Sequence, residues 1–339
     1  MFDRIVAGPC SAETESQVFS TAKQLSAVGI THYRAGLWKP RTSPDSFEGV
    51  GQCGLRWLER VKAELRLKVG TEVANGEHLA QAISIGIDFV WLGARTVTNP
   101  FAVQEIADAL HRTRAEVEVY VKNPVVADIG LWIGAIERLQ KAGVARLVAV
   151  HRGFHTGCTT SIYRNPPQWQ VPIEFKRRRA DIPLLCDPSH ITGDSALVET
   201  VVRQASQLGF DGLMVEVHCE PQQALSDRKQ QITPEQLDSI LQGIRFGAAQ
   251  SDSDEMLSVF RARIDEIDRS LFDVVAQRME LSDKIGEYKK ANDISVLQLN
   301  RYRELLSNSL AYAERHNLNK DFVKQLVELI HQESINRQL

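Results

Sequence analysis

The feature that most constrains this chain is a rhythm in its first 220 residues, where short apolar runs alternate with longer helical stretches. Short β-rich runs alternating with helices indicate right-handed βαβ units and a parallel sheet. Eight such units in about 240 residues favour a (β/α)8 barrel over an open doubly wound sheet. No GxGxxG follows the first run, which argues against a dinucleotide-binding fold. The eight runs lie at residues 4–8, 31–36, 67–73, 88–95, 117–123, 146–153, 182–190 and 212–218.

Each apolar run closes on a side chain that is cationic or able to bind a metal. In a barrel all of these would lie at the C-terminal rim, where such enzymes build their active sites. A single charged residue at a strand end is usually an exposed loop residue, but such a residue at all eight ends predicts a shared site. In chain order they are Cys10, Arg34 with Lys39, Glu72, Arg95, Lys122, Arg152, His190 and Glu216.

A cationic set at the rim suits phosphates and carboxylates. It consists of Arg34, Lys39, Arg41, Arg95, Lys122 and Arg152. Lys39 and Arg41 belong to the stretch GLWKPRTSPDS, whose prolines exclude a helix interior. Two hydroxyls, on Thr42 and Ser43, follow on this stiff loop, a combination that favours an anionic group such as phosphate over a plain solvated turn.

A second set could ligate a divalent transition metal. The mixture of thiol, imidazole and carboxylate fits Mn, Fe, Co or Zn better than Mg. Its members are Cys10, His190, Glu216 and Asp227. The four residues are scattered along the chain, so their spacing gives no support for a metal site. Taken singly, Cys10 could also be a small buried apolar residue, and His190 could be a hydrogen-bonded loop histidine.

Composition indicates a globular, cytoplasmic enzyme. Of the 339 residues 43% are hydrophobic and 24% charged, which suits a sizeable core. The net charge of −3 argues against a protein that binds nucleic acid through its overall charge. The sequence has no apolar span of twenty residues, so no membrane segment is predicted. Five cysteines without framework spacing indicate a reducing compartment.

The pattern changes after Gly247. We expect a barrel over 1–247, a polar, acidic linker over 248–254, and an all-helical domain over 255–339. Apolar positions from Leu257 to Tyr288 recur at steps of three and four, which predicts one helix of about 36 residues with Arg278 in its apolar seam. Two more helices are expected near 298–315 and 320–338. The remaining fifty residues cannot cover so long a helix, so we expect a homodimer through this domain.

Motifs along residues 1 to about 240 resemble those of 3-deoxy-D-arabino-heptulosonate 7-phosphate (DAHP) synthase, in its short type I form. They are GPCS (8–11), YRAGLWKPRTSP (33–44), GTEV (70–73), GART (93–96), VKNP (121–124), HRGF (151–154), CDPSH (186–190), MVEVH (214–218) and LSDR (225–228). The resemblance implies a (β/α)8 barrel that joins phosphoenolpyruvate to erythrose 4-phosphate at the start of the shikimate pathway. The sister family making 3-deoxy-octulosonate 8-phosphate has an Asn within this loop, and Lys-Pro-Arg at 39–41 favours the four-carbon substrate.

The resemblance also implies roles for the rim residues. Cys10, His190, Glu216 and Asp227 would bind the metal, with Mn²⁺ as first choice and Fe²⁺, Co²⁺ or Zn²⁺ as alternatives. Arg95 and Arg152 would hold the phosphoenolpyruvate phosphate, with Arg34, Lys39 and Lys122 near its carboxylate. Arg41, Thr42 and Ser43 would bind the sugar phosphate. Lys39 and Glu72 are the candidates for moving the proton of the attacking water.

The tail, from LSVFRARIDEIDRSLF to Gln338, resembles an AroQ-type chorismate mutase. The resemblance implies that it rearranges chorismate to prephenate, with Lys289 and Gln338 beside the ether oxygen and Arg261 reaching the partner's site. Gln298 and Tyr302 replace acidic residues that many members carry. The positions that match substrate-binding residues are Arg261, Arg278, Lys289, Gln298, Arg301, Ser334 and Gln338.

Three further hypotheses follow from the sequence. The tail could instead be a non-catalytic, ligand-sensing dimerisation module attached to the synthase. The barrel could be a metal-free aldolase that forms a Schiff base on Lys122. A regulatory hypothesis adds that prephenate bound at the tail inhibits the synthase.

Overall fold

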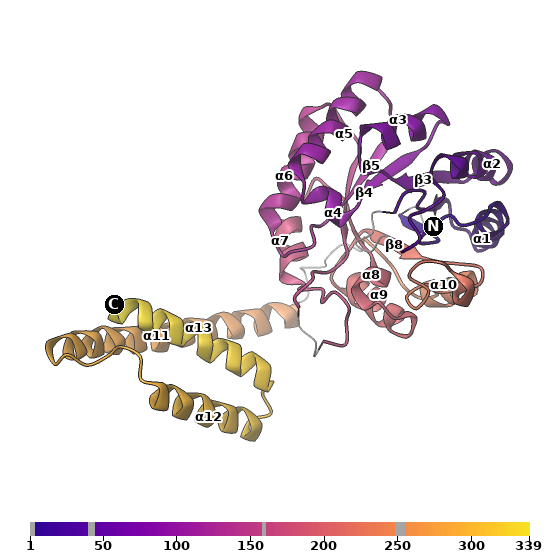
Figure 1. Cartoon of the computed structure of the whole chain (residues 1–339). Helices are drawn as coiled ribbons and strands as arrows, with labels where there is room; N and C mark the ends of the chain where they lie inside the picture. Colours follow the sequence, from indigo (N-terminus) through magenta and orange to yellow (C-terminus); the bar gives the residue numbers. More distant parts are fainter. Residues whose placement is uncertain (1–3, 40–44, 158–160, 248–254) are drawn as a thin grey trace. The chain divides into compact units, whose positions relative to one another are not determined.

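The computed structural model describes residues 4–39, 45–157, 161–247 and 255–339 (Figure 1). The chain divides into two compact units, Met1–Gln250 and Ser251–Leu339. In the described parts of the chain, none of the helices has the length and apolarity to cross a membrane.

The first unit is a closed barrel of parallel strands, which confirms the predicted (β/α)8 fold. Each strand pairs with the next along the chain, and β8 closes the barrel by pairing with β1. The strands are β1 (Ile5–Gly8), β2 (His32–Arg34), β3 (Lys68–Glu72), β4 (Phe89–Leu92), β5 (Glu118–Lys122), β6 (Leu147–His151), β7 (Leu184–Cys186) and β8 (Gly212–Glu216).

Helices cover the outside of the barrel (Figure 1). The longer ones are α1 (Glu15–Ala27), α2 (Leu55–Leu65), α3 (Gly76–Ser84), α5 (Pro100–Thr113), α6 (Ile129–Lys141), α7 (Gln170–Arg178), α9 (Val198–Gln207) and α10 (Pro234–Leu241). Two short ones, α4 (Ala94–Val97) and α8 (Pro188–Thr192), follow β4 and β7 directly at the rim. Side-chain caps fix several starts, because they satisfy backbone N–H groups that have no helical partner. Asn75 accepts from His78 N at 2.8 Å, and Thr233 with Gln236 forms a capping box on α10.

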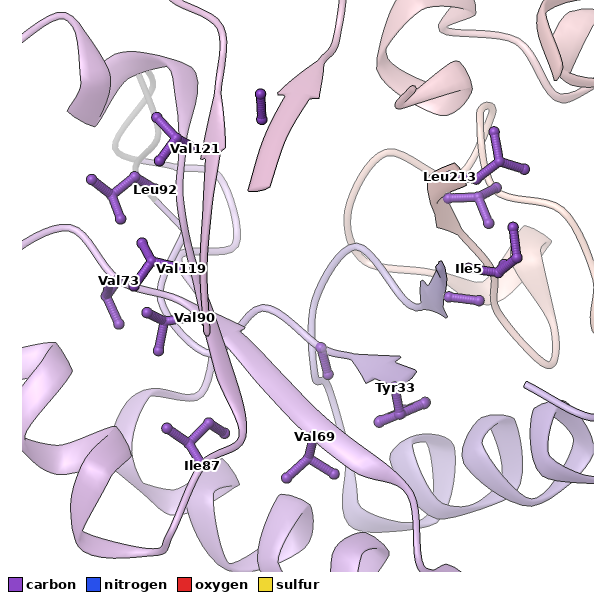
Figure 2. Packing of buried hydrophobic residues seen from close by; sticks show 14 of the residues in the cluster. Ile5, Tyr33, Val69, Val73, Ile87, Val90, Leu92, Val119, Val121 and Leu213 are labelled. Carbon is purple, nitrogen blue, oxygen red and sulfur yellow. The ribbon is translucent and has the colours of Figure 1, made fainter. Parts of the chain in front are cut away.

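The core has two layers, because each strand is buried on both faces. Side chains such as Val69, Val90 and Val119 point outward and pack under the helices (Figure 2). The inner layer fills the barrel with Val6, Phe89, Trp91, Tyr120, Val148, Val150, Leu185 and Met214. Gly70 makes room for this layer, since a Cβ there would lie 2.0 Å from Cε2 of Phe89.

The second unit contains α11 (Glu255–Ala291), α12 (Leu299–Arg315) and α13 (Lys320–Gln338), close to the three predicted helices. α13 packs against both α11 and α12. The contact uses the second half of α11, where Met279 and Ser282 are buried and Gly286 lets α13 approach closely. Residues 256–274 of α11 are exposed on every side and carry large apolar side chains, including Phe260, Ile264 and Leu271.

Candidate active sites

The carboxyl ends of the barrel strands bring the predicted rim residues together. Arg34, Glu72, Lys122 and Glu216 are each the last residue of a strand, and His190 lies on α8 just after β7. A cavity of about 490 Å³ at this end is lined by Lys39, Glu72, Arg95, Lys122, Arg152, His190 and Asp227, among others. A larger groove of about 770 Å³ lies before β5 and β6, at the opposite end of the barrel, and none of the predicted site residues lines it.

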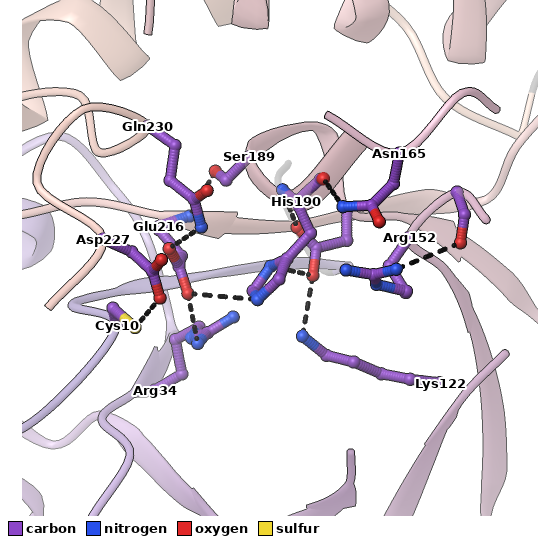
Figure 3. Close-up of polar contacts among 12 residues, drawn as sticks. Cys10, Arg34, Lys122, Arg152, Asn165, Ser189, His190, Glu216, Asp227 and Gln230 are labelled. Carbon is purple, nitrogen blue, oxygen red and sulfur yellow. Dashed lines mark hydrogen bonds and ion pairs between the residues drawn. The ribbon is translucent and has the colours of Figure 1, made fainter. Parts of the chain in front are cut away.

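Four predicted metal ligands converge on one side of this site (Figure 3). Donor atoms of Cys10, Glu216 and Asp227 all lie within 4.8 Å of one another, and Cys10 Sγ is 3.2 Å from Asp227 Oδ2. His190 Nε2 lies 3.8 Å from Glu216 Oε1. Asp227 adopts a left-handed backbone with φ of 46°, a conformation that is uncommon for non-glycine residues.

The charges of this group fit a divalent cation. Burial raises the pKa of the Cys10 thiol to about 12, and the neighbouring Glu216 carboxylate adds to the effect. A thiolate and two carboxylates this close repel one another, and a divalent metal bound by thiolate, imidazole and carboxylate removes that repulsion. The donor set therefore fits the metal that the sequence predicts.

Asp187, which was not among the predicted residues, contacts two of the residues that line the site. Its carboxylate lies 2.9 Å from His190 Nδ1 and accepts a hydrogen bond of 2.7 Å from Lys122 Nζ. Burial alone would raise the pKa of Asp187, but His190 and Lys122 hold it well below its ordinary value. A carboxylate on Nδ1 fixes the imidazole and leaves Nε2 for a metal.

Arg34 is fully buried beside the metal-ligand group. Its Nη2 donates to Glu216 Oε1 at 3.1 Å, and its Cζ lies 4.7 Å from the ring centre of Trp91. Its Nε and Nη1 have no hydrogen-bond partner within the described residues. Buried donors are costly when they stay unpaired, so these two atoms indicate a place for an anionic ligand.

Lys39 lies between the metal-ligand group and Glu72. Its Nζ donates to the carbonyl of Cys10 at 3.0 Å and is 3.5 Å from Glu72 Oε2. Burial alone would lower the pKa of Lys39, but Cys10 and Glu72 outweigh it, so the pKa is raised. Lys39 is thus held as a cation next to a carboxylate.

A group of guanidinium ions occupies another side of the cavity. Burial lowers the pKa of Arg152 to about 10, and the nearby charges of Arg164 and Arg95 contribute. Asn123 orients the strand end by accepting from Arg152 N at 2.6 Å. Three cations that repel one another around a pocket form a receptor for a multiply charged anion.

A second cluster of predicted residues lies in the helical unit. Arg278 on α11 donates from Nη1 to Ser334 Oγ on α13. Lys289 Nζ donates to Gln338 Oε1 at 3.0 Å and to the Val296 carbonyl at 2.7 Å. These bonds join four of the seven predicted chorismate-binding residues.

Of the other three predicted residues of this unit, one shares a groove with Lys289 and two lie on exposed faces. Gln298 precedes α12 and lines a groove of about 340 Å³ that Lys289 also lines. Arg301 pairs with Glu304 on the exposed side of α12. Arg261 lies on the exposed first half of α11.

Comparisons with known proteins match a family to each part of the chain. Residues 3–245 match the model of the DAHP synthetase I family. The chain belongs to this family. Residues 260–339 match the model of chorismate mutase type II. The chain is therefore an enzyme of the shikimate pathway with a DAHP synthase domain and a chorismate mutase domain.

Individual relatives cover the barrel. A phospho-2-dehydro-3-deoxyheptonate aldolase of Thermotoga maritima is 34% identical over 241 residues, which is 71% of this chain and 68% of the relative. A 2-dehydro-3-deoxyphosphooctonate aldolase of Geobacter sulfurreducens is 26% identical and covers 71% of this chain and 90% of the relative. The crystal structure of the DAHP synthase of Thermotoga maritima matches with a TM-score of 0.64 at 31% identity, covering 70% of this chain and 67% of that one.

Two residues that hydrogen-bond to the predicted metal ligands were not predicted from the sequence. Arg164 Nη1 donates to Asp227 Oδ1 at 3.0 Å and to Gln230 Oε1 at 2.9 Å. Gln230 Nε2 in turn donates to Glu216 Oε2 at 2.7 Å. The predicted sugar-phosphate residues Arg41, Thr42 and Ser43 lie outside the described residues.

Proposed function

We propose that this chain is a bifunctional enzyme of aromatic amino acid biosynthesis. Its barrel condenses phosphoenolpyruvate with erythrose 4-phosphate to DAHP and phosphate, with a divalent metal as cofactor. Its helical domain rearranges chorismate to prephenate. The observation that carries the proposal is the convergence of Cys10, His190, Glu216 and Asp227 beside the cationic rim.

The metal would be held by these four side chains, with Mn²⁺ as first choice and Fe²⁺, Co²⁺ or Zn²⁺ as alternatives. When bound, it would supply Lewis acidity at the aldehyde oxygen of erythrose 4-phosphate. His190 is suited to its role because Asp187 orients its ring. Glu216 is oriented by Arg34 and Gln230.

The cationic rim would bind phosphoenolpyruvate. Arg95 and Arg152 would hold its phosphate, and Arg34, Lys39 and Lys122 would face its carboxylate. Arg34 has two buried donors that a carboxylate oxygen would satisfy. The reaction brings two multiply charged anions together, and such a density of cations offsets their repulsion.

The Lys39–Glu72 pair would act on a proton during the reaction. C3 of the enol attacks the aldehyde carbon, water adds at C2, and phosphate leaves by C–O cleavage. Glu72 would take the proton of that water, because Lys39, whose Nζ lies 3.5 Å from Glu72 Oε2, is held as a cation and would stabilise the developing negative charge. Glu72→Gln should therefore lower kcat more than it raises the KM for phosphoenolpyruvate, whereas Lys39→Met should change both, because Lys39 also faces the substrate carboxylate.

The loop sequence supports erythrose 4-phosphate as the sugar substrate. Several relatives are named phosphooctonate aldolases, whose eight-carbon product needs a five-carbon sugar phosphate. Lys-Pro-Arg at 39–41 favours the four-carbon substrate instead. Assays with four-carbon and five-carbon aldose phosphates, each with phosphoenolpyruvate, separate the two activities.

Chelation tests the metal. EDTA should abolish phosphoenolpyruvate consumption, and Mn²⁺ should restore it. Cys10→Ala should not be restored, because a ligand is gone, whereas Cys53→Ala, at an exposed free thiol, should behave as wild type. Full activity after chelation would contradict the metal and favour a Schiff base on Lys122.

Two cations would carry the mutase reaction. The rearrangement needs no nucleophile, so holding chorismate in its reactive conformer and stabilising charge at the ether oxygen suffice. Arg278→Ala and Lys289→Ala should each lower turnover by about 10²-fold or more while the chain stays folded. Lys290→Ala, an exposed neighbour, is the control. If the wild type does not turn over chorismate, the alternative that the tail is a non-catalytic, ligand-sensing module is favoured.

Assembly and regulation complete the proposal. The exposed apolar half of α11 supports a homodimer through the helical domain, which sedimentation would test. The free thiols of Cys10, Cys53, Cys186 and Cys219 are consistent with the reducing cytoplasm.

We also propose that prephenate bound at the helical domain inhibits the synthase. Arg278→Ala in the full chain should then lose prephenate sensitivity and keep basal synthase activity.

A further inference from the structure

A stacked pair of rings joins two loops at the rim of the barrel. The indole of Trp38 lies against the imidazole of His78, with ring centroids 4.4 Å apart and planes inclined by only 8°. Trp38 directly precedes Lys39 in the loop after β2, and His78 lies in the first turn of α3, six residues after Glu72. The stack therefore connects the two segments that carry the Lys39–Glu72 pair. Both members of that pair line the cavity of the candidate synthase site.

Hydrogen bonds of the backbone hold the loop that carries Lys39. The N–H of Lys39 donates to the Glu48 carbonyl at 2.8 Å, and the N–H of Leu37 donates to Thr71 Oγ1 at 3.1 Å. The Lys39 side chain passes close to Gly36, since a Cβ on that glycine would lie 2.9 Å from Lys39 Cδ. These contacts place the start of the loop against β3, the strand that carries the other member of the pair.

His78 is a fixed partner for the indole ring. Its backbone N–H donates to the cap residue Asn75 at 2.8 Å, and its Nδ1 accepts from the N–H of Ala74 at 3.4 Å. Burial lowers the pKa of His78, although nearby carboxylates oppose the effect, so the ring is neutral at pH 7. Trp38 is only partly buried at the edge of the core, so the stack covers part of an indole that core packing leaves open. Stacked rings stabilise a contact beyond the area that they bury.

We propose that His78 is a positioning residue for the synthase reaction, because its stack on Trp38 fixes the Lys39 ammonium beside Glu72. The inference rests on the proposed role of Lys39 and Glu72. Lys39 Nζ lies 3.5 Å from Glu72 Oε2, longer than a hydrogen bond of normal length, so this ion pair alone does not fix the geometry. A lysine side chain is flexible, and a shift of its backbone moves the ammonium. Small displacements of a group that acts on the substrate lower the rate strongly.

The experiment measures phosphoenolpyruvate consumption by the full chain with erythrose 4-phosphate. His78→Ala should lower kcat/KM for phosphoenolpyruvate about three- to tenfold, the size expected for one lost ring stack, while alanine keeps α3 helical. His78→Phe retains a flat ring and should restore most of the loss. His111→Ala, at an exposed histidine of α5, is the matched control and should behave as wild type. If His78→Phe is impaired as much as His78→Ala, stacking is not the cause and the inference is wrong.

A double-mutant comparison separates positioning from a general structural role. In a Lys39→Met background, His78→Ala should lower kcat/KM no further, because its effect passes through the missing ammonium. Phosphoenolpyruvate affinity by calorimetry gives the same comparison where turnover is too low to measure. An equal fold-loss in both backgrounds would contradict a role through Lys39.

Failure of the proposed role of Lys39 gives a different result, since Lys39→Met then keeps wild-type kinetics. Hydrogen exchange of the backbone amides tests the positioning itself in that case. The Lys39 N–H, which donates to Glu48, should exchange several-fold faster in His78→Ala than in His111→Ala, because the loop opens more readily without the stack. Equal exchange in these two variants would overturn the inference.

Discussion

Acid should destabilise the barrel through His151, the last residue of β6, and a single substitution should remove this effect. His151 is fully buried, and neither ring nitrogen has a hydrogen bond of normal geometry to a described residue. Its ring lies 5.5–6.5 Å from those of Trp132, Phe154, Trp169 and Phe210. Burial lowers the pKa of His151 to about 3, an effect that the Pro167 carbonyl offsets only in part.

The sign and size follow from linkage. Between about pH 3 and pH 6.5 the unfolded chain binds a proton at His151 that the folded chain does not. Stability is therefore fully present above about pH 6.5 and falls as the pH drops below it. At pH 5, about 1.5 units below the unfolded pKa, the loss is about 2 kcal/mol. His151→Phe fills the same aromatic surroundings without titrating, at a cost of about 1 kcal/mol at pH 7.

The assay is urea unfolding followed by tryptophan fluorescence at pH 7 and pH 5. All five tryptophans lie in the barrel unit, so the signal reports on that unit alone. Other groups also titrate over this interval, but they are common to both proteins and cancel in the comparison. Wild type should lose about 2 kcal/mol more than His151→Phe between the two pH values. An equal loss in both proteins would refute the argument.

Three further predictions concern the barrel, and two of them include a second substitution for comparison. Gly70→Ala should destabilise it by at least about 1–3 kcal/mol because the new methyl group meets Phe89, whereas Gly134→Ala, with open space in α6, should stabilise it by about 0.5–1 kcal/mol in the same urea assay. Trp91→Leu should raise the KM for phosphoenolpyruvate several-fold, because it removes the ring beneath Arg34, and steady-state kinetics would show this. Lys122→Met should cost about 3–5 kcal/mol, because it leaves Asp187 buried without its ammonium partner, and Asp187→Asn in the same chain should restore part of that stability but not the activity.

The strands could be predicted because strands buried on both faces read as continuous apolar runs. All eight expected runs contain a strand of the barrel. The largest difference is at residues 182–190, where β7 is only Leu184–Cys186. Asp187 caps the next helix and Pro188 is its first residue, so the chain leaves the sheet at that point. The predicted run is longer than the strand because its apolar residues belong to β7 and its last residues belong to α8.

The site was predictable to the extent that topology alone places residues. The parallel-barrel rule brings strand ends together whatever their spacing, which is why Cys10 and Glu216 could be grouped. Arg164 lies in the loop between β6 and α7 and reaches Asp227, 63 residues away, so no local pattern marks it.

The two candidate sites differ in the partners of their cations. In the barrel, Arg34 and Lys122 are paired with the buried carboxylates of Glu216 and Asp187. In the helical unit, Arg278 and Lys289 are held by a hydroxyl, a side-chain amide and backbone carbonyls, which leave their charge uncompensated. Arg278 and Lys289 should therefore gain more from a bound dianion than Arg34 and Lys122 do, and dianion binding at the helical site should weaken with added salt. In the barrel, Arg34 is shared between Glu216 and any anionic ligand, so ligation of a metal by Glu216 should free Arg34 for the substrate and make phosphoenolpyruvate binding depend on the metal.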